Sequence, residues 1–568
     1  MAGVFRVRCF GAPRFLIGLC VALGMTCMAS AQSPVRQAPP VSGLIVKMKD
    51  APSHERMSAL SAGSLREAET GRVRRTLASA RMSEARTRPV GRDALHLDLG
   101  RRLPVAEAQA LAERLRSQPD VEWVELNERE HLLAVPNDQY YRYNAATNDT
   151  GQWWMRPPGE IADGGVASWG APGFEGAWNV ETGLPSAIVA VLDTGTTNHS
   201  DMNAHYLLGY DFVSEVTYSN DGNGRDTDPS DPGDWVPAAQ ANDPNSEFYL
   251  CETTSSWHGT SVSGIIAAVT NNTTGIAGVN WNGRVLPVRV AGKCGATLED
   301  IVDGMRWAAG LSVCRTADSQ GNCVELVPTN TNPARIINIS FGGSAACGNL
   351  YQSTINELAG IGVVVVAAAG NEAGALSRPA SCSGVVAVAA LARDGLKASY
   401  SNFGAGVTVS TLGGDSAVDD GILTLYNTGA ESPDVEDYFN RVGTSFSTPI
   451  VSGVISLMLS ANPNLTVPQV IAGLRSTARP HVTSNLAVCS STNSGACKCT
   501  TSTCGAGILD AEGAVRYAAA PTLPSGGGGG DSGGGALSWI WLVGLGLGVL
   551  ALAGLSRLAR AGREGFAQ

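Results

Sequence analysis

The stretch GVVVVAAAGN at residues 362–371 is apolar without interruption until it ends in glycine and asparagine. Four further runs between residues 187 and 391 share this character: AIVAVLDTG (187–195), GRVLPVRV (283–290), ARIINISFGG (334–343) and GVVAVAAL (384–391). Continuous rather than alternating Val, Ile and Ala residues are typical of parallel strands that are buried on both faces. Segments with helical spacing, such as 298–311 and 448–462, lie between or after them. Residues 136–520 therefore predict an α/β domain in which helices cover both faces of a mostly parallel sheet.

Residues 32–135 have a different composition, rich in Arg and Ala and without cysteine. Three short apolar segments in them, GLIVKMKD (43–50), ALHLDLG (94–100) and VEWVELNERE (121–130), show the alternation of strands. The segment 104–118 has helical spacing, and Pro119 follows it as a stop signal. The pattern predicts a small α+β unit, which by itself fits many regulatory or binding domains.

The first residues predict export from the cell. Three arginines precede the apolar run Phe15–Met28, and Ala29-Ser30-Ala31 follows it. A basic start, a short apolar core and an A-x-A end indicate a secretory signal peptide at residues 1–31; an N-terminal anchor helix is the alternative, for which the run is short. The formal net charge of −11 argues against nucleic acid as the main partner, because phosphate binding needs basic surfaces.

Ten cysteines remain after residue 31, an even number that predicts up to five disulfides in an exported chain. Cys314 and Cys323 flank a short polar loop and are the pair most easily predicted. The cluster CSSTNSGACKCTTSTC (489–504) leaves a zinc site open as an alternative, although it lacks two C-x-x-C pairs.

The C-terminus reads as a glycine-rich linker (521–535), an apolar segment (536–555) and a basic tail (556–568). At ~1.5 Å per residue, 20 residues make a helix about 30 Å long, which is enough to span a bilayer. The arginines after it predict that the C-terminus is cytoplasmic and that the preceding domains lie outside.

Polar residues at the ends of the apolar runs are the first candidates for a site, because ligands bind at the carboxyl ends of parallel strands. Asp193 and Asn371 end two of these runs. Ser445 stands in a glycine turn before an apolar helix, where backbone N–H groups favour negative charge. His258 opens a segment rich in small residues. If the fold brings them together, Asp193, His258 and Ser445 would serve as orienter, base and nucleophile, and Asn371 as an oxyanion donor; for each motif alone, a turn or a helix cap is the alternative.

Five segments, in this order, resemble subtilisin-like serine proteases: VLDTGTTNHSDM (191–202), WHGTSVSGIIAA (257–268), INISFGG (337–343), VVAAAGNE (365–372) and GTSFSTPIVSGV (443–454). The resemblance covers roughly residues 137–520 and implies the subtilisin-like three-layer fold. It also implies a catalytic triad of Asp193, His258 and Ser445, with Asn371 as oxyanion donor. No cofactor enters that chemistry.

The resemblance also implies a substrate site. Ser340, Phe341 and Gly342 would pair with the substrate backbone and form one wall of the pocket for the residue before the scissile bond. Ala368, Ala369 and Gly370 would form the opposite wall. Such a pocket predicts a broad preference for large apolar side chains, and Glu372 at its rim could also accept Lys or Arg.

By the same resemblance, residues 32–135 look like an inhibitory propeptide with a ferredoxin-like fold, removed by autocatalytic cleavage around 131–137; a permanent accessory domain is the alternative. The tail resembles the GlyGly-CTERM sorting signal of Gram-negative bacteria, which a rhomboid-like protease is thought to remove. This favours a transient membrane anchor over a permanent one.

Two calcium sites are predicted. Asp221, Asn223, Asp226 and Asp228 place hard oxygen ligands at close spacing in a glycine-rich loop, although a solvated acidic loop is the alternative and an EF-hand is excluded by the missing distal Glu. Asp201 and Asn272 match, by resemblance, positions at which many subtilases bind calcium.

Two other functions stay open: an inactive, calcium-stabilised surface-binding protein, and an esterase that uses the same triad.

Overall fold

The computed structural model describes residues 41–49, 73–82, 85–91, 94–127, 134–142, 150–161 and 167–520. The predicted signal peptide, glycine-rich linker, membrane segment and basic tail lie outside these residues. Within the described ranges, one helix is long and apolar enough to cross a membrane, α10 (Thr444–Ala461), but 89% of it is buried. It is therefore a core helix.

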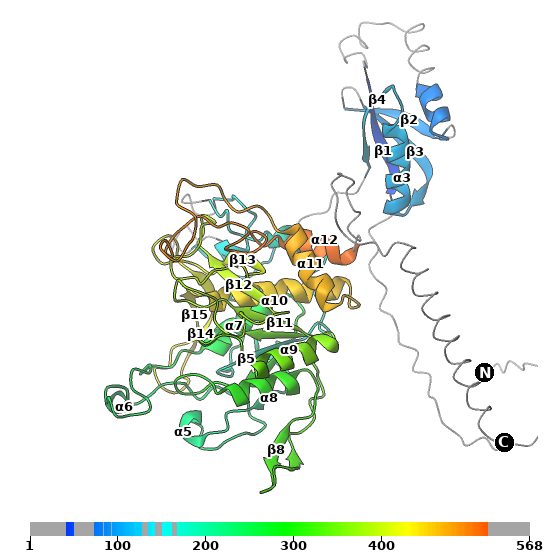
Figure 1. Cartoon of the computed structure of the whole chain (residues 1–568). Coiled ribbons are helices and arrows are strands. Elements are labelled where there is room, and N and C mark those ends of the chain that lie inside the picture. The colour runs from blue at the N-terminus through cyan, green and yellow to red at the C-terminus, as the bar shows by residue number, and fades with distance from the viewer. Residues whose placement is uncertain are drawn as a thin grey trace, which may run out of the picture. The chain divides into compact units, whose positions relative to one another are not determined.

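The N-terminal unit is a four-stranded antiparallel sheet with helices on it, coloured blue in Figure 1. Its strands are β1 (Val41–Met48), β2 (Arg86–Val90), β3 (Ala94–Leu103) and β4 (Val121–Leu126), and its helix is α3 (Val105–Arg116). The strand order β2-β3-β1-β4, with a further helical segment at 73–79 between β1 and β2, is that of a ferredoxin-like fold. The sequence prediction missed β2, whose arginines are exposed and hide its alternation.

The larger domain is built on a seven-stranded sheet in which every strand pair is parallel. The strand order is β13-β12-β11-β10-β5-β7-β6. The bounds are β5 (Val189–Asp193), β6 (Tyr210–Asp211), β7 (Val285–Arg289), β10 (Ile336–Ile339), β11 (Val364–Ala368), β12 (Val386–Leu391) and β13 (Val409–Leu412). All five apolar runs identified in the sequence form strands of this sheet.

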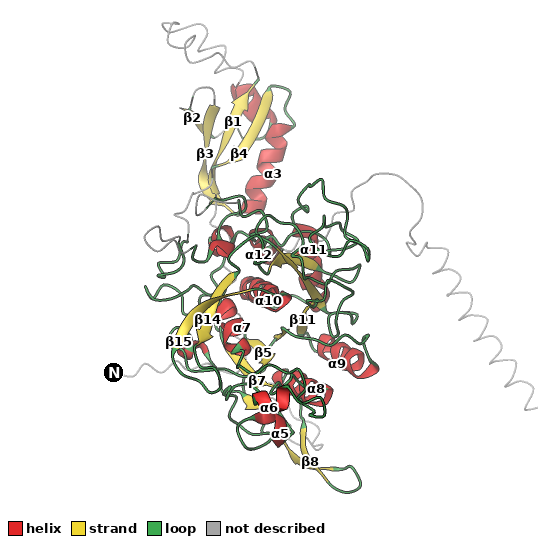
Figure 2. Cartoon of the chain, turned by 90° about the vertical axis from the view of Figure 1, so that its left-hand side faces the viewer, coloured by secondary structure: helices red, strands yellow, loops and turns green. Residues whose placement is uncertain are grey.

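Two separate cores cover the two faces of the sheet, so the domain has three layers. Val189 and Val191 of β5 pack into the core with α7 (His258–Ala267) and α10, whereas Ala190 and Leu192 pack into the core with α8 (Leu298–Ala308) and α9 (Asn349–Gly360). Figure 2 shows these two helix pairs on opposite sides of the strands. Because each strand is buried on both faces, its sequence is continuously apolar. The α/β prediction is confirmed.

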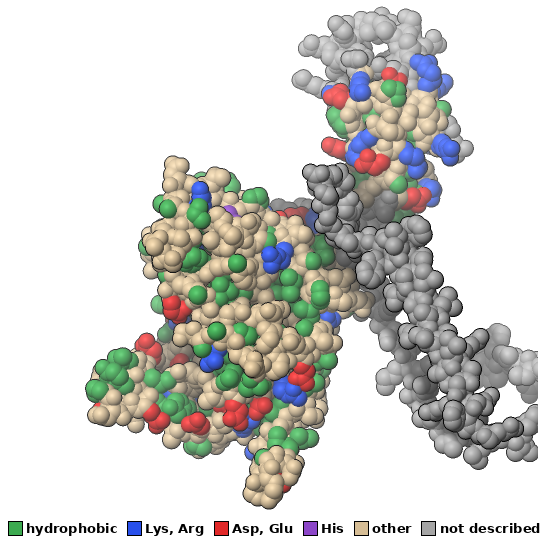
Figure 3. All heavy atoms as spheres, viewed as in Figure 1, with side chains coloured by type: hydrophobic (Ala, Val, Ile, Leu, Met, Phe, Trp, Pro, Cys, Tyr) green, Lys and Arg blue, Asp and Glu red, His purple; other side chains and the backbone are tan. Residues whose placement is uncertain are grey.

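The remaining elements surround this framework. They are the helices α4 (Phe174–Trp178), α5 (Val216–Ser219), α6 (Ala238–Ala241), α11 (Val467–Thr477) and α12 (Ala511–Ala519), the 3-10 turns at Trp153–Met155 and Asn203–His205, and the hairpins β8 (Cys314–Ala317) with β9 (Cys323–Leu326) and β14 (Ile422–Asn427) with β15 (Glu436–Arg441). Figure 3 shows basic side chains spread over the N-terminal unit and acidic ones gathered on the lower part of the larger domain.

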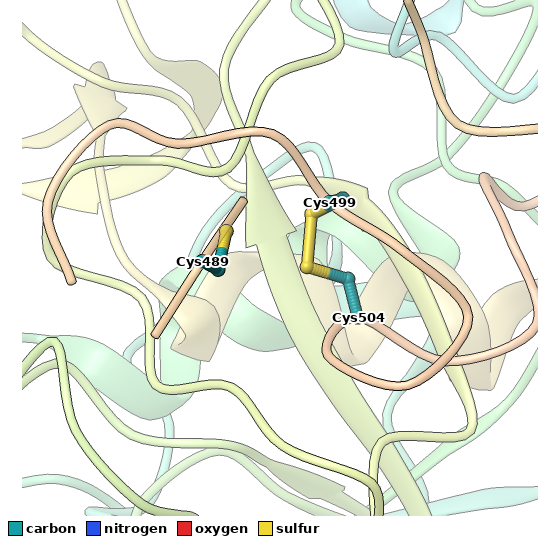
Figure 4. Close-up of side chains that lie close together, drawn as sticks. All are labelled: Cys489, Cys499 and Cys504. Carbon is teal, nitrogen blue, oxygen red and sulfur yellow. A yellow bond between two sulfur atoms is a disulfide. The ribbon is translucent and has the colours of Figure 1, made fainter. Parts of the chain in front are cut away.

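All ten cysteines of the larger domain form disulfides. The pairs are Cys251–Cys294, Cys314–Cys323, Cys347–Cys382, Cys489–Cys497 and Cys499–Cys504. The predicted Cys314–Cys323 bond is confirmed. In Figure 4 the sulfur of Cys489 lies near the Cys499–Cys504 bond. Since all these sulfurs are oxidised, the zinc alternative for this cluster is excluded.

Candidate active site

The first pair of candidate residues is joined by a hydrogen bond at the carboxyl end of the sheet. Asp193 is the last residue of β5 and is 1% exposed, and His258 is the first residue of α7. His258 Nδ1 lies 2.8 Å from Asp193 Oδ1. A Cβ on Gly259 would come within 2.1 Å of the Gly195 carbonyl oxygen, so glycine lets α7 begin this close to β5. The carboxylate can thus fix the tautomer of the imidazole and leave Nε2 for chemistry.

Ser445 lies in the first turn of α10 and lines the same cleft as Asp193 and His258. The sequence predicted this helix from residue 448, but it begins at Thr444, and Pro449 is inside it. Starting the helix earlier places Ser445 among the free N–H groups of the first turn, where negative charge is stabilised. The ring of the next residue, Phe446, packs against His258 with centroids 5.5 Å apart.

Asn371 is oriented by Thr444, a residue that the sequence analysis did not identify. The backbone N–H and the hydroxyl of Thr444 both donate to Asn371 Oδ1, at 2.9 Å each. The hydrogen bonds found for this side chain among the described residues use only its oxygen. Its amide hydrogens therefore remain available to a ligand in the cleft, which Asn371 lines.

The cleft has a volume of about 460 Å³, which is in the range of small-molecule and peptide sites. Ten of the eleven predicted catalytic and substrate-binding residues line it: Asp193, His258, Ser340, Phe341, Gly342, Ala368, Gly370, Asn371, Glu372 and Ser445. The exception is Ala369, which is fully buried beneath the wall. Alternation along a strand explains this difference, because successive side chains point to opposite faces.

The cleft also contains residues that sequence reasoning missed. Tyr351 and Arg378 line it, with the guanidinium of Arg378 5.9 Å from the centre of the Tyr351 ring. Gly343 pairs with Arg378 through two backbone hydrogen bonds of 3.0 and 2.9 Å, and the neighbouring Ser377 N–H donates to the Ala369 carbonyl at 2.8 Å, which links the two walls through this segment. No motif in the sequence marked Arg378, because it reaches the cleft only through this pairing of distant segments.

The predicted calcium ligands Asp201 and Asn272 lie together, and Asp138 joins them. Asn272 Nδ2 donates to Asp201 Oδ1 at 2.7 Å, and the Asp138 carboxylate accepts the backbone N–H groups of Asn271 and Asn272. Burial raises the pKa of Asp201 to about 6, and the negative charge of Asp138 adds to the increase. Two carboxylates and an amide in a partly buried site are a donor set that suits a divalent cation.

The second predicted calcium loop is arranged differently. Asp221 pairs with Arg289 at 2.6 Å, Asp226 accepts from Asn223 at 2.8 Å, and Asp228 accepts from Ser230. No three of the loop's carboxylates lie within 4.8 Å of one another among the described residues. Calcium at residues 221–228 stays a prediction.

The sequence profile of the subtilase family, Peptidase S8, matches residues 185–507, more than half of the chain. The chain belongs to the subtilase family. This places it among the serine peptidases, as the five sequence segments predicted, and agrees with the subtilisin-like fold.

Individual relatives support the assignment. The chain is 39% identical over 421 residues to an extracellular protease of Xanthomonas campestris, covering 74% of this chain and 63% of the relative. It is 37% identical over 360 residues to an extracellular basic protease of Dichelobacter nodosus, covering 62% and 53%. A solved structure of a protease from Pseudoalteromonas arctica is 38% identical, with a TM-score of 0.55, over 68% of this subtilase and 100% of that chain. The subtilase thus spans less than two thirds of the length of the first two relatives.

Proposed function

We propose that this subtilase is a secreted serine endopeptidase. The observation that carries the proposal is the 2.8 Å contact between His258 Nδ1 and Asp193 Oδ1 in a cleft that Ser445 and Asn371 also line. This arrangement provides a base, its orienting carboxylate, a nucleophile and an oxyanion donor around one cavity.

The mechanism is acyl transfer. Ser445 Oγ attacks the peptide carbonyl while His258 Nε2 takes its proton, and Asp193 stabilises the imidazolium that forms. The Asn371 amide and the Ser445 backbone N–H stabilise the oxyanion. The imidazolium then protonates the leaving amine, and water hydrolyses the acyl-enzyme by the same steps.

A fluorophosphonate probe combined with casein hydrolysis tests this function. Labelling at Ser445 together with cleavage of casein supports an endopeptidase. Labelling with ester turnover but no casein cleavage would support the esterase, and absence of labelling in the mature protein would support the inactive binding protein.

The N-terminal unit is proposed as the inhibitory propeptide. Hydrogen bonds to the protease domain support a boundary near residue 134. From there on, the chain is bound to the protease domain: Ala134 N–H donates to Asn179 Oδ1 and Asn137 N–H donates to Asn271 Oδ1. Cleavage just before Ala134 would keep these contacts and Asp138 in the mature enzyme.

Two relatives described as extracellular support export through the predicted signal peptide. The C-terminal segment 521–568 is proposed as a transient anchor that a rhomboid-like protease removes.

Calcium is proposed as a structural ion, with Asp138, Asp201 and Asn272 as the residues that would hold it. Its positive charge would offset the repulsion between the carboxylates of Asp138 and Asp201. We place the main site here because the loop carboxylate Asp221 already has a cationic partner in Arg289.

Removal of calcium is expected to destabilise the mature enzyme. Calcium at a hundredfold excess over its Kd adds about 2.7 kcal/mol, which for a domain of this size corresponds to a fall of about 3 °C in Tm when excess EDTA is added. Differential scanning calorimetry measures this on enzyme blocked with a fluorophosphonate, so that autolysis does not contribute. The Asp201→Asn variant should be insensitive to EDTA. An unchanged wild-type Tm would rule out a stabilising calcium ion.

The substrate pocket is expected to accept large apolar side chains before the scissile bond. Phe341 is half-buried on one wall, and the opposite wall carries only Ala368 and Gly370 before Asn371. Peptides that differ only in Phe, Leu, Lys or Asp at this position should rank with Phe and Leu highest in kcat/KM. Cleavage restricted to one basic motif would contradict a broad enzyme and indicate a dedicated processing protease.

A further inference from the structure

Asn402 is a buried asparagine that binds the chain on both sides of Asn371. It lies in the SNFG segment (401–404), outside every motif considered in the sequence, and is 1% exposed. Its backbone N–H donates to the Gly370 carbonyl at 2.9 Å. Its side chain contacts Ala369 and Glu372 and extends to Gly374.

The Asn402 side chain has no unused hydrogen-bonding capacity. Oδ1 accepts the N–H groups of Glu372 at 3.0 Å and Gly374 at 2.8 Å. Nδ2 donates to the Ala369 carbonyl at 3.1 Å and to Glu372 Oε2 at 2.6 Å. A carboxamide has two donor and two acceptor positions, and all four are used. Aspartate in this place would face a carbonyl and a carboxylate with oxygen only.

Glu372 completes the network by folding back onto the loop. Its Oε2 accepts from Asn402 Nδ2 and from the backbone N–H of Asn371 at 3.0 Å. The carboxylate therefore binds the main chain of the oxyanion donor itself. Gly370 permits this arrangement, because it has φ +109° and a Cβ there would lie 2.2 Å from Asn402 Nδ2.

A buried lysine anchors Asn402 from the other side. Lys397 is 1% exposed, and its Nζ donates to the carbonyls of Ala398 and Ser401 at 2.8 Å each. These bonds fix the segment that ends at Asn402. The loop 369–374 is thus held by the segment that ends at Asn402 as well as by Thr444.

We propose that Asn402 and Glu372 are positioning residues that hold Asn371 and the pocket wall in the geometry required for oxyanion stabilisation. The proposal rests on the proposed endopeptidase function. It changes the role of Glu372 from a charge that accepts basic substrates to an acceptor for two N–H donors. A displacement of about 1 Å at a reacting group can lower turnover by roughly 100-fold, so such residues matter for kcat more than for KM.

Steady-state kinetics of four mature variants test the proposal: Asn402→Ala, Glu372→Ala, Glu372→Gln and the double variant Asn402→Ala/Glu372→Ala. Active sites are counted with a fluorophosphonate, and kcat, KM, Tm and the Ki of a peptide boronic acid are measured on the same preparations. Glu357→Ala is the matched control, because Glu357 forms a surface ion pair with Arg306 on α8 and α9.

Asn402→Ala is expected to lower kcat by roughly 100-fold with little change in KM. The Ki of the boronic acid should rise in parallel, because the tetrahedral adduct of this inhibitor accepts a hydrogen bond from the same Asn371 amide. Glu372→Ala should act in the same direction, and Glu372→Gln should stay close to the wild type because a neutral amide oxygen can still accept. The double variant should be no worse than Asn402→Ala, as residues that act as one unit are not additive.

Several results would overturn the proposal. Wild-type kcat in Glu372→Ala, whose own side chain is exposed, would do so even if Asn402→Ala failed to fold. A selective loss of basic substrates in Glu372→Gln would show that the charge itself is used. Inactivity of the wild type towards casein and the probe would instead reject the endopeptidase function.

Discussion

Replacing Ser445 with alanine is expected to abolish peptide hydrolysis and to leave the precursor uncut. The hydroxyl is the only group in the proposed mechanism that forms a covalent bond to the substrate, and no neighbouring side chain is assigned that role. In a subtilisin, which belongs to the same family, removal of the serine lowers kcat by roughly 2 × 10⁶-fold, and the same order is expected here. Hydrolysis of a peptide anilide and the mass of the purified chain measure both effects.

The matched control is Ser353→Ala, which removes an exposed hydroxyl from α9 that bonds only to the Leu350 carbonyl. It should be processed and should hydrolyse peptides like the wild type. Adding wild-type enzyme to the Ser445→Ala precursor separates the two steps, since cleavage in trans at residues 131–137 would identify the bond that maturation breaks. Turnover retained by Ser445→Ala would contradict the assigned nucleophile.

The architecture of the larger domain was predictable because burial on both faces leaves a strong signal. A strand such as β11 is apolar at every position because both of its faces are buried, and its short length and Val content distinguish it from a buried helix. The boundaries of α10 were not predictable in the same way. The helical spacing predicted a start at residue 448, but α10 begins at Thr444, whose backbone N–H and hydroxyl donate to Asn371 Oδ1. A contact between distant segments overrides the local signal.

The same distinction separates the site residues that the sequence revealed from those that it hid. Asp193, His258, Asn371 and Ser445 each stand at the end of a strand or the start of a helix, where chemistry is concentrated. Asp138 and Asn402 have partners across long chain separations: Asp138 binds the backbone of Asn271 and Asn272, and Asn402 binds the loop that carries Asn371. Nothing local marks an asparagine whose four hydrogen-bonding positions are filled by a loop about 30 residues away. Such residues become visible only when the fold brings the segments together.

Replacing Asn371 with alanine is expected to lower kcat by roughly 10²–10³ while KM changes little. The carboxamide would bind the substrate oxygen mainly after it has become negative, so its loss removes stabilisation from the transition state and not from the bound substrate. The magnitude comes from the corresponding donor in a subtilisin, a member of the same family. Stopped-flow acylation with an active-site titrant and steady-state kinetics measure this effect. A loss confined to KM would instead assign Asn371 to substrate binding.

Thr444→Val provides the matched comparison, because valine keeps the shape and the backbone N–H but removes the hydroxyl that donates to Asn371 Oδ1. One of two restraints on the amide is lost, so kcat should fall by less than in Asn371→Ala. Combining the two changes should add nothing, because the hydroxyl has no amide left to orient. Additive losses would mean that Thr444 contributes independently, for instance through the Gly370 N–H that its hydroxyl also accepts at 3.2 Å. The two variants thus separate the effect of the Asn371 amide, which donates to the oxyanion, from that of the Thr444 hydroxyl, which orients this amide.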